Sequence, residues 1–120
     1  MSKKKVLIIE ADDDVREVRR HELEALGVPI DIHEAKNCNE GIAAMRGCWR
    51  YDAVLVSRER IKGQVEDVIG EAQESTDARV IVTTTAYFKF EEVSRYLKDL
   101  GVHRVLLEPF RRDVLAEALN

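Results

Sequence analysis

The sequence predicts an α/β domain in which a five-stranded parallel sheet carries helices on both faces. Two observations and one rule of topology support this prediction. Continuous apolar runs such as 6–9 and 53–56 are typical of strands that are buried on both faces. These runs alternate with amphipathic stretches whose apolar residues recur at helical spacing. Parallel strands joined by helices need right-handed crossovers, which favour an arrangement with helices on both faces of the sheet.

The five predicted strands are short apolar runs, most of them rich in β-branched residues: 6–9, 30–34, 53–56, 79–85 and 105–107. The first and third are uninterrupted apolar runs, as expected for buried parallel strands. The second contains charged residues and has the weakest pattern. The fourth is dense in Val, Ile and Thr, which favour strands. The fifth is a brief apolar run shortly before Pro109.

The five predicted helices each keep apolar residues on one face: 14–26, 37–45, 61–72, 90–100 and 114–119. Gly27 ends the first helix as a C′ glycine. Asn37 caps the second helix, and Glu40 occupies the N3 position of a capping box. The third helical pattern overlaps the end of a polar loop at 57–63, and Gly101 ends the fourth helix.

Composition limits what this chain can be. Its 120 residues fit one domain, 1–120, and the five strand–helix units use nearly all of them. With 19 Lys and Arg against 23 Asp and Glu, the net charge is −4, so we expect no contact with nucleic acid. The apolar run near the N-terminus is too short for a signal sequence or membrane span, which predicts a cytoplasmic protein. Cys38 and Cys48 lack metal-ligand spacing and are predicted to be free thiols.

In parallel α/β sheets, the functional groups lie in loops at the carboxyl ends of the strands. In this chain those loops are 10–14, 35–37, 57–63, 84–89 and 108–111. The loops after the first and third strands lack a glycine-rich phosphate cradle, which argues against nucleotide binding. A small-molecule or nucleotide site in this crevice remains an alternative.

Four short motifs follow one another in a fixed order along the chain. An acidic turn precedes Arg16, Tyr51-Asp52 precedes the third strand, Thr85-Ala86-Tyr87 follows the fourth, and Pro109-Phe110 follows the fifth. In order and spacing, these motifs resemble the receiver domain of two-component response regulators over nearly the whole chain. The resemblance implies a flavodoxin-like (βα)5 sandwich of three layers with strand order 2-1-3-4-5. It also implies a signalling module in a phosphorelay, and no enzyme.

Carried over residue by residue, the resemblance implies three departures at the phosphorylation site. The phosphoacceptor position falls on Ser57, and the family's acidic pair falls on Glu10 and Ala11. The position of the family's Lys falls on Glu108. Phosphoryl transfer to a carboxylate needs an Asp nucleophile, a cation held by oxygen ligands and a fixed positive group. We therefore expect a degenerate receiver that has no catalytic residue and binds neither Mg²⁺ nor any other metal or cofactor.

Other positions around this site carry further expectations. The family's hydroxyl position falls on Thr85, or on Thr84 if the length of the strand decides. By the same resemblance, the peptide bond before Pro109 is expected to be cis. Asp12 and Asp13 have two interpretations: they cap the first helix, or they form a residual cation site.

The acidic residues at positions 10 and 108 need counter-charges if they are buried. Arg58 and Arg60 lie in the loop after the third strand, close to both positions in the predicted sheet. We therefore expect one of these arginines to form an internal ion pair with Glu10 or Glu108, in place of an ion–phosphate cluster. The alternative is that residues 57–60 form a phosphoserine site or an anion-binding patch.

Charged and aromatic residues gather near the fourth helix and fifth strand: Arg95, Tyr96, Lys98, His103 and Arg104. Receivers commonly use this face to dimerise or to dock partners, so it is a candidate interaction face. The alternative is a solvated helix face without a partner.

The sequence thus predicts a receiver-like module that is not phosphorylated on aspartate and acts through protein–protein interaction. Its expected partners are other signalling proteins, an effector domain in a longer chain, or a second copy of itself. Two alternatives stay open: an atypical but active phosphoacceptor receiver, and a small-molecule or nucleotide-binding flavodoxin-like domain.

Overall fold

A computed structural model describes residues 3–47 and 49–120, so the predicted free thiol at Cys48 lies outside the described residues. The described residues form five strands: β1 (Lys4–Ile9), β2 (Ile30–Ala35), β3 (Ala53–Ser57), β4 (Arg79–Thr84) and β5 (Arg104–Leu107). They also form five helices: α1 (Asp13–Glu24), α2 (Cys38–Arg46), α3 (Val65–Ser75), α4 (Phe90–Asp99) and α5 (Arg112–Leu119). The strands make one parallel sheet in the order β2-β1-β3-β4-β5, which confirms the predicted fold class.

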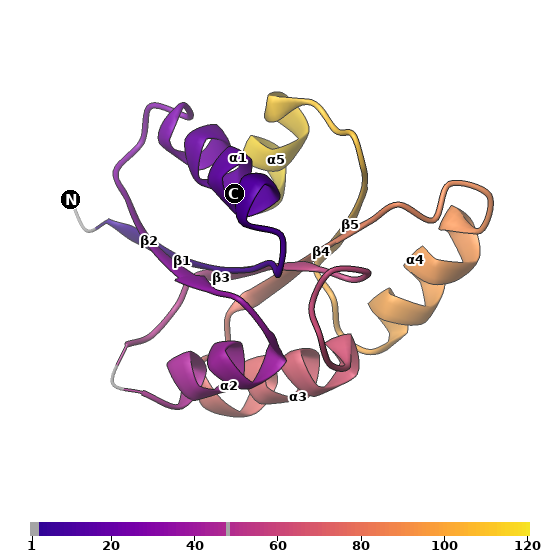
Figure 1. Ribbon diagram of the computed structural model, residues 1–120, viewed down its shortest axis with the longest axis horizontal. Helices are drawn as coiled ribbons and strands as arrows, with labels where there is room; N and C mark the ends of the chain where they lie inside the picture. Colours follow the sequence, from indigo (N-terminus) through magenta and orange to yellow (C-terminus); the bar gives the residue numbers. More distant parts are fainter. Residues whose placement is uncertain (1–2, 48) are drawn as a thin grey trace.

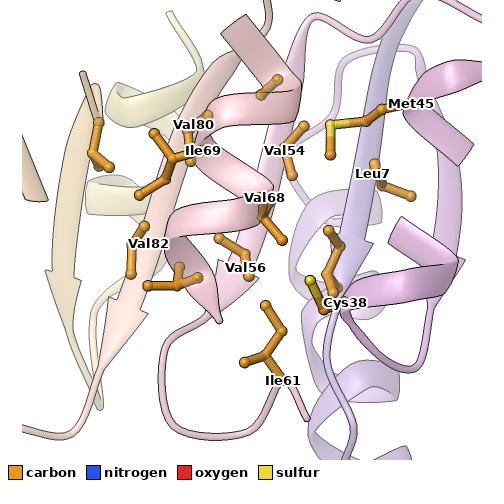
Figure 2. Close-up of a cluster of buried hydrophobic side chains, with 14 of the residues drawn as sticks. Leu7, Cys38, Met45, Val54, Val56, Ile61, Val68, Ile69, Val80 and Val82 are labelled. Carbon is orange, nitrogen blue, oxygen red and sulfur yellow. The ribbon is translucent and has the colours of Figure 1, made fainter. Parts of the chain in front are cut away.

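Two layers of helices cover the sheet (Figure 1). On one face, α1 and α5 pack on alternate residues of the strands, such as Val6 and Ile8 of β1. On the other face, α2, α3 and α4 cover Leu7, Ile9 and their neighbours, in the larger cluster of buried side chains that Figure 2 shows. Because both faces are buried, β1 and β3 read as continuous apolar runs in the sequence.

Side-chain caps fix where the first two helices begin. Asp12 Oδ1 accepts hydrogen bonds from the backbone N–H groups of Asp14 (2.9 Å) and Val15 (3.0 Å). Asn37 Oδ1 caps α2 by accepting from the N–H of Glu40 at 2.8 Å. The capping box differs from the prediction in one bond, because Glu40 Oε1 accepts from the N–H of Lys36 and not from that of Asn37.

Several predicted boundaries were wrong by a few residues. The first helix ends at Glu24 instead of residue 26, and Gly27 (φ 76°) follows two residues beyond the C-cap Ala25. The spacing that assigned Ile61 to the third helix was misleading, since this helix begins at Val65. Ile61 lies in the preceding loop and is buried there. The spacing of apolar residues therefore identified a buried position correctly, but this position is not helical.

Two further observations concern the chain as a whole. In the part of the chain that the structure describes, no helix is long and apolar enough to cross a membrane. The Cys38 thiol is free, as predicted; it is also buried, and burial raises its pKa.

Candidate functional site

The carboxyl ends of four strands meet at one edge of the sheet and bring the predicted site residues together. Glu10 directly follows β1, Ser57 ends β3, Thr84 ends β4 and Glu108 directly follows β5. The N–H of Glu108 donates to the carbonyl of Thr84 at 2.8 Å, which joins the β4 and β5 ends beyond the ladder. The Glu108–Pro109 bond is cis, the isomer that the resemblance implied.

Arg60 connects the buried carboxylate of Glu10 with the partly buried carboxylate of Glu108 at the centre of this site. Its Nε lies 3.1 Å from both carboxylate oxygens of Glu10, and its Nη2 lies 2.8 and 2.9 Å from those of Glu108. The backbone N–H of Ala11 donates to the Arg60 carbonyl at 2.8 Å, which fixes the loop that carries Arg60. The predicted internal ion pair is therefore present, and Arg60 is the arginine that makes it.

The two carboxylates around Arg60 favour its charged form against the effect of burial. Burial acts to lower the pKa of its guanidinium, but the hydrogen bond and charge of Glu108, together with Glu10, outweigh it and raise the pKa. The Glu10 side chain is 2% exposed and that of Glu108 is 10% exposed. Without Arg60, two negative charges would lie out of water with one counter-charge fewer.

Arg19 of α1 is a second cation in the cluster, and its role was not predicted from the sequence. Its Nη2 forms an ion pair with Glu108, and its Nη1 contacts Glu22 Oε1 at 2.8 Å. Its guanidinium also lies 4.5 Å from the centre of the Phe110 ring. A signal was available: Arg19 lies four residues before the apolar Leu23, and these two are the buried residues of α1.

Arg58, the other candidate, points to a different partner. Its Nη1 lies 2.7 Å from Glu59 Oε2, and the same oxygen accepts the Thr84 hydroxyl at 2.7 Å. Glu59 Oε1 accepts the N–H of Thr85 at 3.0 Å. Glu59 thus connects the β3–α3 loop to the end of β4, another contact that was not predicted from the sequence.

The two candidates for the hydroxyl position lie in different surroundings. Thr84 is fully buried, and its hydroxyl also accepts the N–H of Ala86 at 3.1 Å. Thr85 lies just beyond the end of β4 and is exposed. The strand therefore ends one residue earlier than its predicted end at Thr85, and it is the Thr84 hydroxyl that faces the polar contacts of the site.

Ser57, on which the resemblance places the phosphoacceptor position, is 3% exposed. Among the described residues, its Oγ is the buried side-chain oxygen or nitrogen that has no hydrogen-bond partner. A serine hydroxyl needs a neighbouring base to become a nucleophile, and no such base contacts it. Ser57 therefore has neither the carboxylate nor the activation that phosphoryl transfer requires.

The side chains at this edge do not fit a divalent cation. The Glu10 oxygens accept from Arg60 and from the N–H of Asp12 (3.0 Å), and Ala11 offers no side-chain oxygen. Asp12 serves as the cap of α1, and Asp13 pairs with Arg16, which lowers the pKa of Asp13. In the described ranges, no three His, Cys, Asp or Glu side chains are grouped so that they could hold a metal. Hard cations need several converging oxygen ligands, and these residues do not supply them.

The candidate interaction face lies on α4 and the start of β5. Arg95, Lys98 and Arg104 are exposed, and Tyr96 is half exposed, with its hydroxyl donating to Glu66 Oε2 of α3 at 2.8 Å. Burial and the nearby charges of Arg79 and Arg104 lower the pKa of His103, which disfavours its charged form.

Known proteins match this chain in their structure but not in their sequence. No protein-family model matches the sequence, and no curated protein matches it. Among solved structures, a response regulator receiver domain from Clostridium thermocellum is 19% identical, with a TM-score of 0.83, and the match covers 98% of this chain and 91% of that one.

Two further solved structures show the same likeness. The receiver domain of a sensor histidine kinase from Pseudomonas aeruginosa PAO1, described with a magnesium ion in its active-site cleft, is 17% identical (TM-score 0.81; 98% and 95% covered). A chemotaxis response regulator of Vibrio cholerae is 18% identical (TM-score 0.76; 98% and 97% covered). At these identities the likeness establishes the fold, which is that of response-regulator receiver domains.

Proposed function

We propose that this chain is a receiver-like signalling module that is not phosphorylated on aspartate and acts by binding other proteins. The observation that carries the proposal is the position of Arg60 between Glu10 and Glu108. In an active receiver, a cation and a phosphoryl group would share this edge of the sheet. In this chain, the Arg60 guanidinium and the Glu108 carboxylate lie at this edge instead.

Charge supports this proposal independently of the missing aspartate. A transferred phosphoryl group spreads negative charge over its oxygens and needs positive groups close by. Glu108 places a carboxylate there, and the guanidiniums of Arg60 and Arg19 are already bonded to it. An incoming phosphate would have to separate these pairs. The module is therefore proposed to need no Mg²⁺ and to catalyse no reaction.

The proposed partners are other signalling proteins or an effector domain in a longer chain. The exposed residues on α4 and β5 are candidates for this contact, as is self-association through the same face. Without phosphate as a signal, any change of conformation must come from a partner that binds two states with different affinities.

The test uses acetyl phosphate and beryllofluoride, each with Mg²⁺, followed by intact mass and backbone amide shifts. We expect no adduct and no saturable shift with either reagent. A stoichiometric acid-labile adduct on the wild-type chain would overturn the proposal.

A matched variant carries the three family-type groups, Ala11→Asp, Ser57→Asp and Glu108→Lys. Circular dichroism first establishes that this variant folds. Beryllofluoride shifts in the variant and none in the wild type would attribute the loss of phosphorylation to these three positions.

A further inference from the structure

A groove of about 500 Å³ lies between α1 and the loop that joins β5 to α5. Its volume is within the range of small-molecule sites. Val15 and Val18 of α1 form one apolar wall, and Pro109 and Phe110 form the other. Arg60 and Glu108 contribute to its lining, so the groove borders the ion-pair cluster described above.

Three residues of α1 give this groove an apolar centre with an acidic group on each side. Asp14, Val18 and Glu22 all line it and are spaced four residues apart, so they lie in one row along the helix. A rise of 1.5 Å per residue separates the Cα atoms of Asp14 and Glu22 by about 12 Å. An acidic residue therefore stands at each end of the row, with the half-exposed Val18 between them.

The groups still open to a ligand are hydrogen-bond acceptors. Within the described part of the chain, the Asp14 carboxylate has no hydrogen bond or ion pair, and Glu22 uses only Oε1, toward Arg19. The cations are engaged: Arg19 contacts Glu22 and Glu108, and Arg60 contacts Glu10 and Glu108. An anion would have to displace Glu108 from two guanidiniums, whereas a cation meets oxygens that have free lone pairs.

We propose that this groove binds a linear aliphatic di- or polyamine, with one ammonium group at Asp14, another at Glu22, and the methylene chain along Val18 and Phe110. Three carboxylates and two guanidiniums line the groove, which gives it the sign of charge that such a ligand needs. Ammonium groups donate to the open carboxylate oxygens, while the apolar walls remove the methylene groups from water. Because Arg60 and Glu108 line the same groove, the ligand would act on the cluster that stands at the phosphorylation site.

The test is a titration of the full chain with 1,8-diaminooctane at physiological salt, followed by backbone amide shifts. We expect saturable shifts at residues 14–22 and 108–110. Octylamine, with the same chain length and one ammonium group, should bind several-fold more weakly. Asp14→Asn and Glu22→Gln should each weaken diamine binding about two- to fivefold, because exposed ion pairs contribute modestly in water.

Two variants separate the groove from general attraction to an acidic protein. Val18→Lys places a bulky cation in the middle of the groove and, since Val18 is half exposed, should leave the fold intact while abolishing binding. Glu17→Gln combined with Glu24→Gln removes two exposed charges of the same helix outside the groove, and should change the affinity less than twofold.

Three results would overturn the proposal: equal weakening by the Glu17/Glu24 control and the groove variants, equal affinity for the monoamine and the diamine, or no saturable shift up to about 10 mM diamine. None of these depends on the phosphorylation test, so the two proposals can fail separately.

Discussion

At the scale of single residues, the site depends on one guanidinium that satisfies two carboxylates. Glu10 and Glu108 come from different strand ends, and neither has enough exposure to be solvated by water alone. Breaking a buried ion pair from one side leaves an uncompensated charge, which costs more than the pair itself contributes. Arg60 is therefore a position where a small change has a large effect on stability.

We predict that Arg60→Ala lowers the free energy of unfolding by about 3 kcal/mol at neutral pH, as expected when a buried charge loses its partner. Urea unfolding followed by circular dichroism measures this loss. The matched control is Arg58→Ala, because the Arg58 side chain is 38% exposed and pairs with its neighbour Glu59. That variant should lose less than about 1 kcal/mol. Equal losses would contradict the assigned role of Arg60.

Ser57 and Thr84 form a second matched pair, two buried hydroxyls at the ends of β3 and β4. The Ser57 hydroxyl has no partner, whereas that of Thr84 donates to Glu59 and accepts from Ala86. We predict that Ser57→Ala is neutral or stabilising by up to about 1 kcal/mol, because an unpaired hydroxyl leaves water without compensation. Thr84→Val should instead cost about 1–2 kcal/mol. Chemical unfolding of both variants measures the difference. A clear loss of stability in Ser57→Ala would contradict this prediction, because it would mean that the Ser57 hydroxyl makes a stabilising interaction.

At the scale of elements, Glu59 fastens the β3–α3 loop to the β4 end. Burial pushes the pKa of Glu59 upward, but hydrogen bonds from Thr84 and Thr85 and the pairing with Arg58 outweigh it and leave the pKa below its ordinary value. The folded protein therefore holds the ionised form more firmly than the unfolded chain does. This carboxylate contributes stability above the pKa that it has when unfolded, and that contribution disappears as pH falls through the lower pKa of the folded state.

We predict that Glu59→Gln reduces the acid sensitivity of the fold. The unfolded carboxyl has a reference pKa of 4.5, so the wild type should lose stability over roughly pH 5 to pH 3 more steeply than the variant does. Urea unfolding at a series of pH values gives both slopes. Thr84→Val removes one of the same hydrogen bonds and should flatten the slope in the same direction. Identical slopes for wild type and Glu59→Gln would show that this contact does not set the acid response.

At the scale of the whole molecule, the sequence was most informative where burial and local structure agree. The sheet order and layers were predictable because β1 and β3 are buried on both faces and appear as unbroken apolar runs. The start of the third helix was predicted wrongly at Ile61, because a buried loop residue can continue a helical spacing by chance. The Arg60 contact followed from its loop and the charge at position 108. Arg19 and Glu59 did not, because contacts between distant segments depend on how side chains turn after the sheet is assembled.

The arrangement of charges also predicts how the whole fold responds to Mg²⁺. A ligand that binds only the folded state stabilises it by mass action, so a site with a dissociation constant of about 0.1 mM would contribute about 2.7 kcal/mol at about 10 mM Mg²⁺. For a domain of this size, such a gain raises Tm by on the order of 10 °C. Here Arg60 already occupies the Glu10 carboxylate and Ala11 offers no ligand, so we predict the same Tm in MgCl₂ and in EDTA. Thermal unfolding with NaCl matched for ionic strength separates screening of the net charge of −4 from binding. A rise of several degrees that appears with MgCl₂ and not with NaCl would mean that the folded chain does assemble a cation site, and that the ion pairs of Arg60 can open to admit it.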